Sequence, residues 1–240
     1  MSSNISLTTP IVSVKWLQEH LNADNLIILD GTIVKSFDAL QQQIPNARFF
    51  DIKLKFSDTS DAFPSACPTA SQFQKEARKL GINQNSAIVV YDDKGIYSSA
   101  RVWYLLRAFG FNNVAVLNGG FPEWLKSGYA TEETNLYEGG IGDFEANLQP
   151  NFMKFFDDIE ANSKNETHKI IDARSSGRFN CKEPEPTPIQ LVPVLVIKEL
   201  KPIPILSTST PICANNAKSL KLATFPIAFA FKSTAPVAPV

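Results

Sequence analysis

Residues 87–124, AIVVYDDKGIYSSARVWYLLRAFGFNNVAVLNGGFPEW, contain the pattern that decides the fold. Ala87–Tyr91 and Val114–Leu117 are short apolar runs rich in β-branched residues, which is typical of buried strands. Between them, residues 102–109 repeat apolar side chains at helical spacing, and Ser98–Ser99 can cap that helix. Strand, loop, helix and strand form a βαβ unit. We therefore expect a parallel sheet, with any ligand at the carboxyl ends of its strands.

The same kind of pattern predicts further elements on both sides of this unit. A Ser13-capped helix at 14–21 precedes a buried strand at 26–29, which ends in the turn Asp30-Gly31. Ser71 can cap a helix that ends near residue 80. In the second half we expect a helix at 152–162 and a strand at 169–174 that repeats the pattern of residues 28–30. Two connections are also expected, a helical turn at 36–43 and an interdomain linker at 131–151.

Residues 89–128 resemble the first domain of tandem rhodanese-family sulfurtransferases, the thiosulfate and 3-mercaptopyruvate type. Four more segments agree with that family in the expected order: TPIVSVKWLQEHL, LIILDG, IPNARFFDI and IIDARSSGRFN. At the third of these, Gln43, which directly precedes the segment, and Asn46 replace the usual His and Gly, and Asn tolerates a left-handed turn well.

The resemblance covers residues 8–186 and implies an α/β protein with a central parallel sheet flanked by helices, followed by an incomplete second copy. The implied division is a non-catalytic rhodanese-like domain at 8–130, the linker at 131–151, and the start of a second domain at 152–186. Residues 187–240 then form a tail that does not resemble the family.

This tail has an unusual composition for a parallel α/β domain. Ten prolines and no glycine follow Arg178. Tight strand–helix loops need glycine at left-handed positions, and central strands exclude proline. Two explanations remain open: a reading frame that shifts after Pro186, which would truncate the family-like part, or a genuine proline-rich tail that is disordered or loosely docked.

The family's reaction needs a cysteine in a glycine-rich loop at a helix N-terminus, where backbone N–H groups stabilise the thiolate and the persulfide. The resemblance implies a loop like Cys-Gly-Ser-Gly-x-Thr-Ala, and residues 182–240 contain none. Cys213, without neighbouring glycines, is the candidate nucleophile that remains. In the first domain, loop 92–97 places carboxylates where a thiolate would sit, so it is either an inactive copy or a general base.

Arg178 matches the family's substrate-binding arginine, since a guanidinium can hold an anionic group by two hydrogen bonds. Cys181 lies close to Arg178 in sequence and is a candidate reactive thiol, or an exposed cysteine of no special chemistry.

The resemblance implies transfer of sulfane sulfur from thiosulfate or 3-mercaptopyruvate to cyanide or a thiol, through a cysteine persulfide and without a cofactor. The chain itself is expected to be impaired. The alternative is an inactive rhodanese-like binding module or a truncated gene product. A phosphatase of similar topology is disfavoured because no Cys-x5-Arg loop occurs.

Composition excludes several other classes. The formal net charge is −1, and no apolar run approaches the ~20 residues of a membrane helix, so we expect neither nucleic acid nor a membrane as partner. Only two histidines are present, which disfavours a metal site. The three cysteines form no CxxC pair and favour a reducing compartment. With no recognisable targeting peptide, a cytoplasmic monomer is expected, with a mitochondrial location as the alternative.

Overall fold

The computed structural model describes residues 4–35, 37, 41–61 and 65–183, and every structural statement below concerns these residues. The chain divides into two compact units, Met1–Gln149 and Pro150–Val240, which are treated separately.

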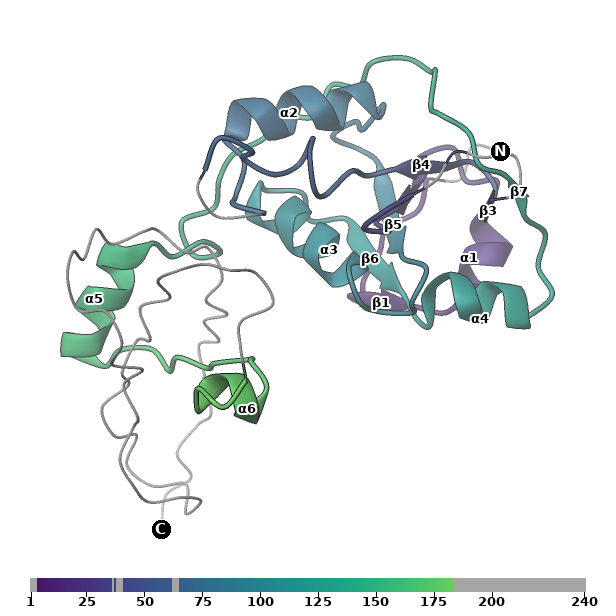
Figure 1. The fold of residues 1–240 in the computed structure, drawn as a ribbon. Helices are drawn as coiled ribbons and strands as arrows, with labels where there is room; N and C mark the ends of the chain where they lie inside the picture. Colours follow the sequence, from purple (N-terminus) through teal and green to yellow (C-terminus); the bar gives the residue numbers. More distant parts are fainter. Residues whose placement is uncertain (1–3, 36, 38–40, 62–64, 184–240) are drawn as a thin grey trace, which may run out of the picture. The chain divides into compact units, whose positions relative to one another are not determined.

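The first unit is built on a five-stranded sheet (Figure 1). Its strand order is β1-β6-β5-β2-β4, and every neighbouring pair is parallel. The central strand β5 is buried at all five positions, as its unbroken apolar run predicts. The predicted parallel sheet is therefore confirmed. The strands are β1 (Ile11–Val12), β2 (Leu26–Asp30), β4 (Ala47–Phe49), β5 (Ala87–Tyr91) and β6 (Val114–Leu117).

Helices cover both faces of this sheet (Figure 1). On one face, α2 (Ala70–Lys79) and α3 (Ser99–Ala108) share a core with Ile88 and Val90 of β5. On the other face, α1 (Val14–His20) and α4 (Gly120–Lys126) pack with Val89 and Tyr91 of the same strand. Successive side chains of a strand point to opposite faces, so one apolar strand supplies both cores.

The helix starts show which hydroxyls act as caps. Ser13 accepts a hydrogen bond from Trp16 N and begins α1 as predicted. The prediction for α2 was wrong by two residues: the helix begins at Ala70, and Thr69 rather than Ser71 accepts from Gln72 N, at 3.2 Å. At α3, Ser98 occupies the cap position without a side-chain capping bond, because a carboxylate described below takes that role.

A second, two-stranded sheet replaces the helical turn expected at 36–43. Gln42–Gln43 (β3) pairs antiparallel with Glu132–Glu133 (β7), so the prediction was wrong for residues 42–43, whereas 36 and 38–40 lie outside the described residues. Long-range pairing with β7 outweighs any local helical tendency there. Asn46 has φ 62°, and the predicted left-handed turn is confirmed.

The first unit extends to Gln149, beyond the boundary expected near residue 130. Within the segment expected as a linker, Phe144 is 1% exposed and packs in the core with Ile82 and Phe111. Backbone bonds from Asn147 N to Phe109 O (3.0 Å) and from Gln149 N to Ala108 O (2.7 Å) secure its end. Residues 132–149 therefore complete the core as well as leading to the second unit.

The described part of the second unit contains two helices, α5 (Phe156–Asn165) and α6 (Ser176–Phe179). Helix α5 begins four residues later than predicted, where the carboxylate of Asp158 accepts from Phe155 N at 2.9 Å. The strand predicted at 169–174 is absent. Ile171 is exposed there, and no described residue pairs with its backbone as a strand requires. Residues 187–240 lie outside the described residues, so the two explanations of the tail remain predictions.

Candidate functional site

The loop that follows β5 is closed by one carboxylate. Asp92 is completely buried, and its Oδ2 accepts bonds from the backbone N–H groups of Tyr97, Ser98 and Ser99 at 2.8, 3.0 and 2.9 Å. Ser99 Oγ donates to the same oxygen at 2.6 Å, and Lys94 N donates to Oδ1 at 2.8 Å. The loop thus forms a cradle of donors at the N-terminus of α3, and Asp92 fills it.

The charge of Asp92 suits this position. Burial by itself raises the pKa of this carboxyl, but the bonds from Ser99, Tyr97 and Lys94 together outweigh burial and hold the pKa below its usual value. The positive end of the α3 dipole acts in the same direction. The cradle therefore stabilises an anion that belongs to the chain, and a carboxylate kept this strongly ionised is a poor general base.

The backbone around the cradle is tightly fixed. Phe121 N donates to the carbonyl oxygen of Asp92 at 3.0 Å, so the start of α4 is joined to the loop. Gly120 has φ 55°, and a Cβ at this position would lie 2.6 Å from Asp92 O and 2.5 Å from Gly95 O. Only glycine fits there. Asp93, the second acid of the loop, is exposed. This geometry favours a structural role for loop 92–97.

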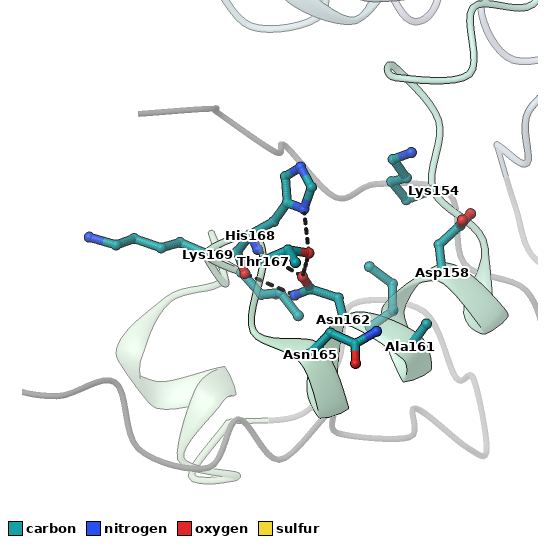
Figure 2. A pocket seen from close by; sticks show the side chains of 10 residues that line it. Lys154, Asp158, Ala161, Asn162, Asn165, Thr167, His168 and Lys169 are labelled. Carbon is teal, nitrogen blue, oxygen red and sulfur yellow. Dashed lines mark hydrogen bonds between the residues drawn. The ribbon is translucent and has the colours of Figure 1, made fainter. Parts of the chain in front are cut away.

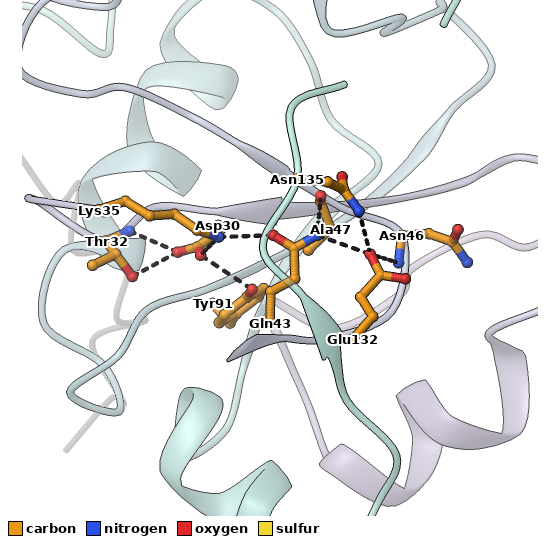
Figure 3. Close-up of polar contacts among 9 residues, drawn as sticks. All are labelled: Asp30, Thr32, Lys35, Gln43, Asn46, Ala47, Tyr91, Glu132 and Asn135. Carbon is orange, nitrogen blue, oxygen red and sulfur yellow. Dashed lines mark hydrogen bonds and ion pairs between the residues drawn. The ribbon is translucent and has the colours of Figure 1, made fainter. Parts of the chain in front are cut away.

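A second polar cluster lies at the carboxyl ends of β2 and β5 (Figure 3). Lys35 forms an ion pair with Asp30, and the two side chains are only 4% and 5% exposed. Thr32 N and Thr32 Oγ1 donate to Asp30 Oδ1 at 3.0 and 2.6 Å, and Tyr91 OH donates to Oδ2 at 3.2 Å. Burial, together with the nearby Asp30 charge, raises the pKa of Tyr91 well above its usual value. Both carboxylate oxygens of Asp30 are thereby satisfied, which indicates a structural ion pair.

Sequence analysis did not find Lys35 as part of this cluster. The turn Asp30-Gly31 is a visible signal, but the partner five residues away lies in an irregular segment without periodicity. Gln43 was noted only as a substitution, yet it is completely buried and accepts a bond from Lys35 Nζ at 2.9 Å.

Cys67 is the free thiol of the described residues and is half-buried beside the core. Burial raises its pKa to about 11, although the Arg101 guanidinium lowers it in part. Arg101 Nη2 donates to Ser65 O at 2.7 Å and so holds the loop that carries Cys67. A thiol with this pKa is almost entirely protonated at neutral pH and is a poor nucleophile.

We expect iodoacetamide to modify Cys67 about 100-fold more slowly at pH 8 in the folded chain than in the chain unfolded in urea. The pKa rises from 9.0 to about 11, and each pKa unit lowers the thiolate fraction tenfold below the pKa. Mass spectrometry of the peptide containing Cys67, with time and at several pH values, measures the rate. Equal rates in the folded and unfolded chains would contradict this assignment.

The structure does not bring the second unit's predicted site residues together as a thiol site. Cys181 is disulfide-bonded, so its sulfur is not a free thiol here, and Cys213 lies outside the described residues. Arg178 lies in α6, where its N–H donates to Ser175 Oγ at 3.3 Å. Arg174 Nη2 forms an ion pair with Asp172 Oδ2 at 2.7 Å, and hydrogen bonding to Arg174 holds the pKa of Asp172 below its usual value.

The second unit also has a cavity of about 200 Å³ between α5 and residues 167–170 (Figure 2). Asn162 Nδ2 donates to His168 O, and His168 N donates to Asn162 Oδ1, each at 2.8 Å. None of the described residues that line this cavity is a cysteine. Among the described residues, no group of three or more His, Cys, Asp or Glu side chains is placed to hold a metal ion. In the same part of the chain, no helix is long and apolar enough to span a bilayer.

The parallel sheet with two helices on each face, and the strand–loop–helix cradle at its carboxyl edge, define a rhodanese-like α/β protein. Residues 13–127 match the rhodanese-like domain family. The solved structure of SseA, a 3-mercaptopyruvate sulfotransferase from Escherichia coli, superposes with a TM-score of 0.67. It is 33% identical, and the match covers 73% of this chain and 69% of SseA. The chain belongs to the rhodanese family.

Curated relatives agree with this assignment. Thiosulfate/3-mercaptopyruvate sulfurtransferase 1 of Arabidopsis thaliana is 34% identical over 212 residues, which cover 77% of this chain and 56% of the relative. Human 3-mercaptopyruvate sulfurtransferase is 33% identical over 195 residues, which cover 75% of this chain and 64% of the relative. The chain thus spans less than two thirds of the length of these two relatives.

Proposed function

We propose that this chain is a sulfurtransferase of the thiosulfate or 3-mercaptopyruvate type with impaired activity. In the reaction, a cysteine thiolate attacks the outer sulfur of thiosulfate, the S–S bond breaks, and sulfite leaves. Cyanide or a thiol then takes that sulfur from the persulfide, and the thiolate is regenerated. No external oxidant or cofactor is needed. The names of the relatives support the reaction class.

The observation that carries the impairment is that residues 182–240 contain no glycine-rich cysteine loop. The first unit offers no substitute, because its cradle is already occupied. Asp92 already supplies the anion that the backbone N–H groups of Tyr97, Ser98 and Ser99 bind. A donor anion therefore has no free site there, and loop 92–97 contains no thiol. The nucleophile has to come from elsewhere. Cys67 is protonated at neutral pH, and Cys213 has no glycine-rich loop around it.

Arg178 is the residue we assign to the donor's anionic group. A guanidinium offers paired N–H donors to a carboxylate or a sulfonate, and Arg178 stands in the segment that resembles the family's substrate-binding segment. Thiosulfate and 3-mercaptopyruvate both carry such a group, so this residue type fits either donor.

We expect the chain to produce little or no thiocyanate from cyanide with either donor. Incubation with thiosulfate or 3-mercaptopyruvate, followed by intact mass measurement, should show little added sulfur. Cys213→Ser tests the candidate nucleophile, and Cys67→Ser, which replaces a thiol with a raised pKa, is its matched control. Robust turnover that Cys213→Ser abolishes and Cys67→Ser preserves would contradict the proposed impairment and would identify the nucleophile.

The second candidate function is a non-catalytic rhodanese-like binding module. The cradle closed by Asp92 favours it, because a fixed loop without a nucleophile is suited to structure or recognition rather than turnover. The same assay separates the two functions. A binding module forms no persulfide with either donor, whereas an impaired enzyme accumulates the added sulfur slowly at one cysteine.

A further inference from the structure

Residues 131–141, called the strap below, contain β7 and the irregular residues that lead to the segment anchored by Phe144. At their start, β7 pairs with β3 through only two residues on each strand. Thr134 N adds a bond to Gln41 O at 2.9 Å, and Thr131 Oγ1 donates to Gln42 Oε1 at 2.6 Å. So short a ladder holds a segment only weakly.

Glu132 concentrates the side-chain contacts of the strap on one atom (Figure 3). Its Oε1 accepts bonds from Gln43 Nε2 at 2.9 Å, Asn46 N at 3.0 Å and Asn135 Nδ2 at 3.1 Å. Asn46 is the left-handed residue of the turn before β4, so the same carboxylate joins the strap, β3 and that turn. Bonds to a charged acceptor are stronger than neutral ones.

The buried Lys35–Asp30 ion pair is connected to Glu132 through the side chain of Gln43. The Gln43 amide is completely buried: its oxygen accepts from Lys35 Nζ, and its nitrogen donates to Glu132 and to Ala47 O. A cation on one side and an anion on the other fix the orientation of this amide. Loss of the Glu132 carboxylate leaves a buried donor with one partner fewer, which favours opening of the site to water.

The far end of the strap is held independently. Gly142 N bonds to Arg78 O at 2.8 Å, and Phe144 N bonds to Ile82 O at 3.1 Å, next to the buried Phe144 ring. Between the two ends, Leu136 and Ile141 are 63% and 81% exposed. In the middle, the Arg48 guanidinium lies 4.1 Å from the centre of the Tyr137 ring, which also lies close to Gly81. The start of the strap is therefore held mainly by polar contacts around Glu132, whereas the residues that follow the strap are anchored in the apolar core.

We propose that the Glu132 carboxylate holds the strap in place and that the strap detaches reversibly: residues 131–141 leave the first unit while residues 142–149 stay anchored in its core. Release uncovers Gln43 and the Lys35–Asp30 pair and lengthens the free chain that precedes the anchored segment. Segments with few buried apolar contacts open at low free energy, and the strap meets this description.

Amide hydrogen exchange on the full chain tests the proposal. In Glu132→Ala we expect exchange of Thr134 N and Asn46 N to accelerate at least tenfold, with Phe144, Asn147 and Gln149 unchanged. Glu133→Ala, an exposed acid in the same strand, is the matched control and should change neither set. Glu132→Gln keeps the side-chain shape without the charge, should give an intermediate rate, and provides a second variant if Glu132→Ala folds poorly.

Two results would overturn the proposal. Equal acceleration of amide exchange in Glu132→Ala and Glu133→Ala would show that the Glu132 carboxylate does not hold the strap in place. Acceleration that extends through residues 142–149 by the same factor would show that the strap does not open separately from the core.

Discussion

Replacing Asp92 with alanine should lower the free energy of unfolding of the first unit by about 3 kcal/mol or more, since each buried donor left without a partner costs about 1–3 kcal/mol. The carboxylate is completely buried and satisfies four N–H groups and one hydroxyl. Trp16, Trp103 and Trp124 all lie in the first unit, so fluorescence during urea unfolding of the full chain reports on this unit. Asp93→Ala, the exposed neighbour, should change the free energy by less than about 0.5 kcal/mol.

The pH dependence of this effect has a definite sign. The pKa of Asp92 is lowered in the folded chain, so its ionised form stabilises the fold above the ordinary aspartate pKa of about 3.9. This contribution is lost as the pH falls through the folded pKa. The stability difference between the wild-type chain and Asp92→Ala should therefore shrink below about pH 4. A difference that grows on acidification, or equal effects of Asp92→Ala and Asp93→Ala, would contradict the role assigned to the cradle.

Replacing Lys35 with methionine should destabilise the first unit by about 3–5 kcal/mol, the cost of removing one partner from a buried ion pair. Asp30 would remain buried with a charge that Thr32 and Tyr91 alone have to stabilise. Gln43 Oε1 would also lose its donor. The same fluorescence measurement of urea unfolding gives the free energy.

A double variant and a surface control sharpen this test. Asp30→Asn combined with Lys35→Met removes the unpaired charge, so it should recover a large part of the loss. Lys126→Met removes a side chain that is 78% exposed and should have little effect, since its pair with Glu123 is a surface one. If the double variant were as unstable as the sum of its two single variants, the ion pair would not be the source of the effect.

The fold could be predicted where the sequence carries periodic information over short distances. Ala87–Tyr91 and Val114–Leu117 gave both central strands with the observed bounds. Helix α3 between them follows from the spacing of its apolar residues. Ser13 was recognised as a cap because its hydroxyl lies just before an amphipathic run. These sequence patterns are local, and the apolar residues that form them are the ones that the strands and helices bury in the core.

The polar chemistry could be predicted only in outline. The sequence placed carboxylates in loop 92–97, but their roles depend on backbone direction, which turns Asp92 inward and leaves Asp93 exposed. The bond from Gln43 to Glu132 joins residues that are 89 positions apart, and neither segment has a strong periodic pattern. Contacts of this kind form only after the sheet is assembled.

The strand expected at 169–174 shows another limit of sequence patterns. Ile170 and Ile171 have the β-branched character of a strand, yet strand structure depends on a hydrogen-bonded neighbour, and none exists among the described residues. The segment at 26–30, with a similar sequence pattern, becomes β2 because β4 and β5 lie on both sides of it.

The position of Phe144 determines where the first half of this chain can be cut. The match to the rhodanese-like domain family ends at residue 127, after the last helix on the sheet. A recombinant fragment ending there would lack the ring that packs edge-on against Phe73 and Phe111, with centroids 6.2 and 5.4 Å away. Phe73 and Phe111 would each lose this contact, and the part of the apolar core that Phe144 fills would open to water, which favours self-association. A fragment that contains the whole first unit should therefore end after Gln149.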